Sequence, residues 1–122
     1  MSEKKNILIV EDDKDARTLL IKMVESMGHN VFAYESGEDT LKDIPGREIH
    51  LALLDIMMPE MNGYELLEKI KELPEFDSLP VIMVTAKDQD SDILKGYSTG
   101  ADYYITKPYT SKQIKYGLDL LL

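Results

Sequence analysis

The sequence predicts an α/β protein of five strand–helix units, (βα)₅, built around one open parallel sheet. Short runs of β-branched and other apolar residues alternate along the chain with segments whose apolar residues recur every three or four positions. One run, HLALLD at 50–55, is almost continuously apolar, which is typical of a central parallel strand covered on both faces. Because crossovers between parallel strands are right-handed, such units favour a doubly wound sheet with helices on both faces.

Each expected strand is a short apolar segment bounded by polar or turn-forming residues. The expected strands are residues 7–10, 31–34, 50–55, 80–86 and 103–106. Together with the helices between them they occupy most of the 122 residues, and neither a linker nor an internal repeat interrupts them. We therefore expect a single domain over residues 1–122.

The clearest expected helix follows the first strand. Its apolar residues recur at spacings of three and four and form one stripe: Ala16, Leu19, Leu20, Met23, Val24 and Met27. Gly28 stands directly after them, where a left-handed residue often ends a helix. We expect this stripe to lie on the sheet.

The next two helices are marked by the residues at their ends. Ser36, with Asp39 three residues later, begins a short helix that the Pro-Gly pair at 45–46 ends. The Asn-Gly pair at 62–63 precedes the following helix, which ends before the Leu-Pro pair at 73–74. The residues of that helix expected to face the core are Leu66, Leu67 and Ile70.

Two further helices are expected near the C-terminus. DILKGY at 92–97 predicts the fourth helix, and Ser111 begins the last one. The last helix is expected to turn Ile114, Leu118 and Leu121 inward. The same part of the chain holds five of the seven tyrosines, at positions 97, 103, 104, 109 and 116. They favour a contact surface, and packing at the edge of the core is the alternative.

Composition restricts the function. A formal net charge of −9 argues against a general nucleic-acid or anionic-membrane surface and fits a cation site or a basic partner. The absence of cysteine excludes disulfides and thiolate chemistry. The apolar segment before the first acids is too short for a secretory signal or a membrane span. We therefore expect a cytoplasmic location.

Polar residues stand where the predicted strands end. They are Glu11, Asp12 and Asp13 after the first strand, Asp55 after the third, Thr85 after the fourth and Lys107 after the fifth. One or two acids would suffice to cap a helix, so capping alone does not explain three consecutive acids. In open α/β sheets the loops at the carboxyl ends of the strands build the site. We expect these side chains to converge on one edge of the sheet.

Three or four carboxylates in a small cleft repel one another unless a cation lies among them. Oxygen ligands without His or Cys favour Mg²⁺, or Mn²⁺, over zinc. Because Mg²⁺ often bridges carboxylates and a phosphate oxygen, the site predicts a phosphoryl group. Asp55 would be the nucleophile that forms an aspartyl phosphate. Lys107 and the Thr85 hydroxyl would stabilise the phosphoryl oxygens.

Four segments also carry a family resemblance. They are VEDD at 10–13, LLDIMMPEMNG at 53–63, VTA at 84–86 and GADYYITKP at 100–108. The chain resembles the receiver domain of two-component response regulators, the CheY-like family, over almost its whole length. The resemblance implies a flavodoxin-like fold with strand order 2-1-3-4-5. It also implies that Mg²⁺ is held by Glu11, Asp12, Asp55 and the backbone carbonyl of Met57.

By the same resemblance, a sensor histidine kinase or a histidine phosphotransfer protein passes a phosphoryl group to Asp55, and hydrolysis later removes it. Lys107 matches the family's lysine, Thr85 its switch hydroxyl and Tyr104 its switch aromatic. Phosphorylation would draw Thr85 toward the phosphoryl group and let Tyr104 turn inward. The face of the fourth helix, fifth strand and fifth helix would then bind a downstream protein, an output domain or a second copy. Such a receiver catalyses its own modification and is not a freestanding enzyme.

Other interpretations stay open. Glu11 and Asp12 alone could be helix caps. An FMN- or nucleotide-binding module on the same fold would need amides and small residues where the first loop is acidic. An aspartate-dependent phosphatase would need a second acid at Met57, and a pseudo-receiver would only mediate contacts. The Lys107–Pro108 bond is commonly cis in the family, and an ordinary trans turn is the alternative.

Overall fold

Residues 4–86 and 100–122 are described in the computed structural model. The strands are β1 (Asn6–Val10), β2 (Asn30–Tyr34), β3 (Leu51–Asp55), β4 (Val81–Ala86) and β5 (Tyr103–Lys107). Neighbouring strands are parallel, and their order in the sheet is β2-β1-β3-β4-β5. The α/β fold and the strand order 2-1-3-4-5 are confirmed. Each strand begins and ends within one residue of the bounds expected from the sequence.

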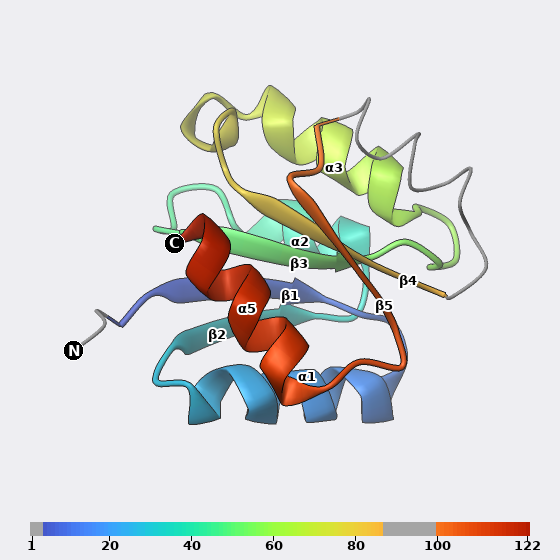
Figure 1. Cartoon of the computed structure of the whole chain (residues 1–122). Coiled ribbons are helices and arrows are strands. Elements are labelled where there is room, and N and C mark those ends of the chain that lie inside the picture. The colour runs from blue at the N-terminus through green and yellow to red at the C-terminus, as the bar shows by residue number, and fades with distance from the viewer. Residues whose placement is uncertain (1–3, 87–99) are drawn as a thin grey trace.

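The helices form a layer on each face of the sheet. They are α1 (Lys14–Ser26), α2 (Gly37–Asp43), α3 (Gly63–Glu72), the 3-10 helix η1 (Pro74–Phe76) and α5 (Ser111–Leu121). Figure 1 shows α1 and α5 on one face and α2 and α3 on the other. The predicted fourth helix at 92–97 lies outside the described residues. In the described part of the chain, no helix is both long and apolar enough to cross a membrane.

The strands supply two core clusters because successive side chains point to opposite faces of the sheet. The side chains that pack toward α2 and α3 include Leu8, Val10, Leu54 and Met83. Those that pack toward α1 and α5 include Ile7, Ile9, Leu53 and Ile82. All five residues of β3 are buried, as expected for a central strand with a layer on each face.

The inward stripe of α1 is narrower than the sequence predicts. Leu20 and Val24 are buried and form its centre. The assignment of Leu19 to this stripe is wrong, because Leu19 is 52% exposed. With about 100° of rotation per residue, Leu19 lies about 100° from Leu20 and about 140° from Val24 around the helix. Ile21 packs at the edge of the core instead.

Side-chain caps fix where each helix leaves the carboxyl edge of the sheet. Asp13, Ser36, Asn62 and Thr110 cap α1, α2, α3 and α5. Asp13 accepts a hydrogen bond from the Ala16 backbone N–H at 2.8 Å, so helix capping explains this third acid of the loop. The carboxylates of Glu11 and Asp12 remain for another task.

Candidate metal and phosphoacceptor site

Four of the predicted site residues lie at the carboxyl ends of four strands. Glu11 directly follows β1, and Asp55 ends β3. Thr85 is the penultimate residue of β4, and Lys107 ends β5. Because β1 pairs directly with β3, Glu11 and Asp55 come to lie side by side. The strand order thus brings residues from distant parts of the sequence to one edge of the sheet, and Figure 1 shows the strands that carry them lying side by side.

Glu11, Asp12 and Asp55 form a carboxylate cluster at this edge. One oxygen from each residue lies within 4.8 Å of the other two. Glu11 is only 3% exposed and Asp55 only 5%, whereas Asp12 is exposed at the rim. Like charges that are buried this close repel each other, and a divalent cation among them would remove the repulsion. The three predicted carboxylate ligands are therefore brought together.

Lys107 reaches the cluster from β5. Its Nζ lies 2.9 Å from Glu11 Oε1 and 3.6 Å from Asp55 Oδ1. In the sheet β4 stands between β5 and β3, so the lysine side chain has to extend across the end of β4. Contacts with Glu11 and Asp55 overcome the effect of burial and raise the pKa of Lys107, which keeps it an ammonium. The one positive charge of this ammonium does not balance the negative charge that three ionised carboxylates would carry.

Burial and mutual contact separate the pKa values of the two buried acids. Burial, followed by the hydrogen bond and the charge of Glu11, raises the pKa of Asp55 to about 7. Burial also acts to raise the pKa of Glu11, but hydrogen bonds with Asp55 and Lys107 outweigh it and leave that pKa below its usual value. Glu11 is thus the acid of the pair that ionises first as the pH rises, and Asp55 is the one that keeps its proton up to a pH of about 7.

The two predicted switch residues lie on the α3 side of the sheet. Thr85 is fully buried, and its Oγ1 donates a long hydrogen bond of 3.3 Å to the Ala86 carbonyl. Tyr104 pairs in register with Met83, two residues before Thr85 on the neighbouring strand, so both side chains point to the same face. Tyr104 is half-buried, and its hydroxyl lies 3.3 Å from the hydroxyl of Tyr64 on α3.

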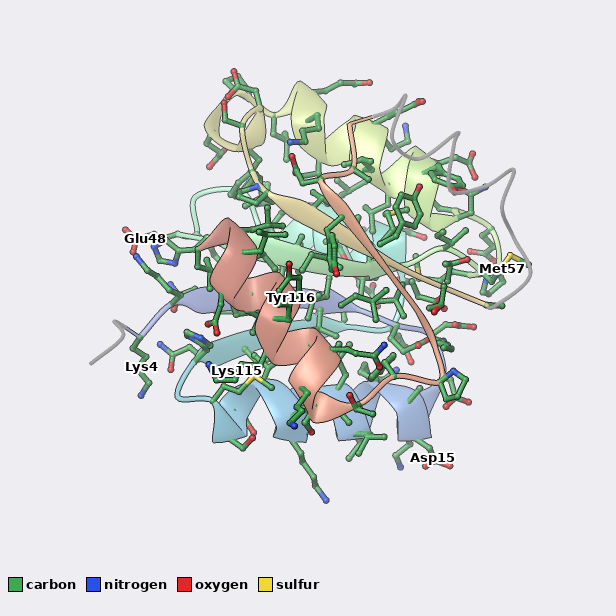
Figure 2. All side chains as sticks on the ribbon, in the orientation of Figure 1. Lys4, Asp15, Glu48, Met57, Lys115 and Tyr116 are labelled. Atoms are coloured by element: carbon green, nitrogen blue, oxygen red, sulfur yellow. The ribbon has the colours of Figure 1, made fainter. Side chains whose placement is uncertain are left out.

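Met57 contacts Asp55 through its backbone. Its side chain is 59% exposed. Figure 2 shows it at the end of the sheet opposite to Lys4 and Glu48. A hydrogen bond with the Met57 backbone acts to lower the pKa of Asp55, against the larger effect of burial. That its carbonyl is a metal ligand stays a prediction. The Lys107–Pro108 peptide bond is cis, the isomer that the resemblance implies.

Two residues beside the site, Tyr64 and Arg17, were not singled out in the sequence, and Gly63 was noted only in the turn that precedes a helix. Gly63 begins α3 against the end of β3, where an added Cβ would lie 2.5 Å from the Asp55 carbonyl oxygen. Tyr64 meets Tyr104, and Arg17 meets the backbone of the acidic loop. Gly63 stands inside the quoted segment at 53–63, but nothing in the local pattern shows which groups Gly63, Tyr64 or Arg17 contacts.

Comparison with known proteins assigns the family. Residues 7–119 match the response regulator receiver domain family, and the chain belongs to this family. Over 114 residues it is 37% identical to the regulatory protein VanRc of Enterococcus gallinarum, which covers 93% of this chain and 47% of VanRc. The chain spans about half the length of the curated relatives it matches.

Solved structures agree on the fold. The chemotaxis protein CheY4 of Vibrio cholerae superposes with a TM-score of 0.93 at 20% identity, over 98% of this chain and 100% of that chain. The receiver domain of the sensor histidine kinase PA1611 from Pseudomonas aeruginosa gives a TM-score of 0.88 at 23% identity, over 98% of each chain. The PA1611 structure has a magnesium ion coordinated in its active site cleft.

Proposed function

We propose that this chain is a phosphoacceptor receiver. Asp55 takes a phosphoryl group from the phosphohistidine of a sensor histidine kinase or a histidine phosphotransfer protein, in a reaction that depends on Mg²⁺. The observation that carries the proposal is the cluster of carboxylate oxygens from Glu11, Asp12 and Asp55, within 4.8 Å of one another and beside Lys107. Membership in the response regulator receiver family supports the same reaction.

The donor set at this edge fits Mg²⁺. The proposed ligands are the carboxylates of Glu11, Asp12 and Asp55 and the backbone carbonyl of Met57, all of them oxygen atoms. Hard cations such as Mg²⁺ prefer oxygen, and Mn²⁺ accepts the same ligands. The magnesium ion in the PA1611 receiver supports this choice of metal. Bound Mg²⁺ would supply charge neutralisation and polarise the phosphoryl oxygens.

Asp55 acts as the nucleophile in the proposed transfer. A carboxylate oxygen of Asp55 forms a bond to phosphorus while the bond from phosphorus to the imidazole nitrogen breaks, and the released imidazole takes a proton from water. The ammonium of Lys107, 3.6 Å from Asp55 Oδ1, is placed to bind a phosphoryl oxygen. Its contact with Glu11 at 2.9 Å keeps that ammonium at the site. In hydrolysis, water attacks phosphorus and the Asp55 carboxylate leaves.

Thr85 and Tyr104 are proposed to turn this modification into a change of shape. A phosphoryl group on Asp55 adds acceptor oxygens near the end of β4, toward which the Thr85 hydroxyl can move. Tyr104, on the same face of the neighbouring strand, then repacks. The proposed result is a population shift between two packings.

A downstream protein, an output domain or a second copy of the chain would bind the switched face. We propose that residues 1–122 act as one receiver domain. The curated relatives, which are about twice as long as this chain, support the pairing of such a receiver with an output domain.

The acceptor can be tested by intact mass. With Mg²⁺ and a small acyl phosphate such as acetyl phosphate, the parent protein should gain one phosphoryl group, and Asp55→Asn should gain none. Asp13→Asn is the matched control, because it removes an acid from the same loop while asparagine still caps α1. The control should be modified as the parent is.

Two results would contradict the assignment. Equal modification of Asp55→Asn would show that another residue is the acceptor. No modification of the folded parent, with a histidine phosphotransfer protein as a second donor, would identify a pseudo-receiver.

A further inference from the structure

Arg17 turns back from the first turn of α1 to the acidic loop. Its Nη1 donates to the Glu11 carbonyl oxygen at 2.9 Å and lies 3.4 Å from the Asp12 carbonyl oxygen. The side chain is half-buried. Glu11 and Asp12 are the two residues of this loop whose carboxylates join the cluster with Asp55. Arg17 therefore contacts the backbone of both cluster acids that come from the loop.

The Arg17 guanidinium binds backbone carbonyls and not the carboxylates of the cluster. In the part of the chain that the structure describes, the ion pair of Glu11 is with Lys107, and Arg17 forms none. A cation placed among the carboxylate oxygens would compete with Mg²⁺, whereas one bound to the carbonyls does not occupy the ligand atoms. The planar guanidinium presents fixed donors, so it can restrain the two carbonyls and with them the direction of the attached side chains.

We propose that Arg17 is a positioning residue for the metal site: it holds the backbone of Glu11 and Asp12 so that their carboxylates face Asp55. The inference rests on the proposed function, since it assumes that the cluster binds Mg²⁺. Groups that orient metal ligands without touching the metal commonly influence metal affinity. Arg17 would be such a group for two proposed ligands, Glu11 and Asp12.

A positioning role and a purely electrostatic role predict opposite effects. A positive charge near the site repels Mg²⁺, so removing it should strengthen Mg²⁺ binding if charge is all that matters. If Arg17 positions the loop, removing it should weaken binding. Arg17→Lys keeps the charge but loses the planar fork, so it separates the two contributions.

The chain offers a matched control, because Arg47 is its other arginine. Arg47 also donates to a backbone carbonyl, that of Asp43, at 3.0 Å. It precedes Glu48, which Figure 2 shows at the end of the molecule opposite to Met57. Arg47→Ala removes the same charge from the chain as Arg17→Ala while leaving the acidic loop intact.

The test is the Mg²⁺ dissociation constant, measured by isothermal titration on the full chain. Arg17→Ala should weaken Mg²⁺ binding by about tenfold. Arg17→Lys should recover only part of that affinity, and Arg47→Ala should bind as the parent does. Thermal unfolding without Mg²⁺ is measured in parallel to show that each variant is folded. Should Arg17→Ala not fold, Arg17→Lys alone decides, because the positioning role requires weaker binding in that variant too.

The contradicting outcomes are distinct. The positioning role is overturned if folded Arg17→Ala binds Mg²⁺ as tightly as the parent or more tightly, even if its melting temperature is lower. Where Arg17→Ala does not fold, the same result for Arg17→Lys overturns it. Equal weakening in Arg47→Ala overturns it as well, because the loss of affinity would then not depend on contact with the acidic loop. A parent protein that binds no Mg²⁺ refutes the proposed metal site itself, and the inference falls with it.

Discussion

Asp55 and Glu11 are buried carboxylates with different surroundings. Glu11 has the Lys107 ammonium at 2.9 Å, which favours its ionised form. Asp55 is farther from that ammonium, at 3.6 Å, and burial together with Glu11 raises its pKa to about 7. A carboxyl group has to lose its proton before it binds Mg²⁺ or attacks phosphorus. Asp55 is therefore the member of the cluster that should respond to pH near neutrality.

Mg²⁺ affinity is expected to fall as the pH decreases through about 7, because protons and the cation then compete for Asp55. Isothermal titration over a pH series checks this, with proton release on binding as a second readout. Without Mg²⁺, the stability of the folded protein depends on pH in the opposite direction. The folded pKa of about 7 lies above the ordinary 3.8, so the contribution of Asp55 to the free energy of unfolding decreases as pH rises through this interval. A Mg²⁺ affinity independent of pH around 7 would contradict the raised pKa of Asp55.

The residue types of the proposed site are visible in the sequence, but the different protonation behaviour of its two buried acids is not. Acids, a hydroxyl and a lysine at strand ends are visible along the chain. The difference between Glu11 and Asp55 depends on a contact with Lys107, which is 96 residues from Glu11. The pattern of neighbouring residues gives no information about a contact between residues so far apart in the sequence. The orientation of Arg17 toward the loop was missed for a different reason: Arg17 is only six residues from Glu11, but the residue pattern does not show in which direction a long side chain extends.

At the scale of elements, the start of α3 lies directly against the end of β3, which carries the proposed acceptor Asp55. The Gly63 N–H donates to the Ile56 carbonyl at 2.9 Å. Reciprocal hydrogen bonds between Asn62 and Glu65 then fix the first turn of the helix. Because Gly63 has no Cβ, this turn approaches the Asp55 backbone closely, and we expect the helix and Asp55 to move together.

Gly63→Ala is expected to destabilise the protein by about 1–3 kcal/mol and to weaken Mg²⁺ binding, since the new Cβ meets backbone atoms that cannot yield cheaply. Those atoms are the Asp55 carbonyl oxygen at 2.5 Å and the Ile56 Cα at 2.9 Å. Gly37→Ala is the matched control, because its Cβ would meet the flexible Met61 side chain, with Sδ at 2.6 Å. Urea denaturation with and without Mg²⁺ measures both variants. Equal stability of the two would show that the close approach at Gly63 is unimportant.

Elements with strong local signals were predicted well. Caps, turn residues and apolar runs placed the described strands and the starts of the helices. The error at Leu19 arises because spacings of three and four fit a stripe of uncertain width, and only the packed structure shows where its centre lies. The 3-10 helix η1 was missed because three residues after Leu73 leave no periodic pattern.

For the molecule as a whole, strand order is what turns scattered polar residues into a site. The order β2-β1-β3-β4-β5 places β1 and β3 side by side at the centre of the sheet and leaves β5 within reach of a lysine side chain. Hydrophobic period gives the strands but not their order. That order came from the family resemblance, and the structure confirms it.

The central claim, that one divalent cation sits between the β1 loop and Asp55, can be tested by locating the ion in the intact molecule. Mn²⁺ at low occupancy broadens the NMR signals of amides near it, and isotope-labelled protein reports every amide separately. The strongest broadening is expected at residues 11–13 and 55–57, with reversal on addition of excess Mg²⁺. Strongest broadening at other acids, such as Glu38 and Asp39 of α2, with residues 11–13 and 55–57 unaffected, would contradict the claim.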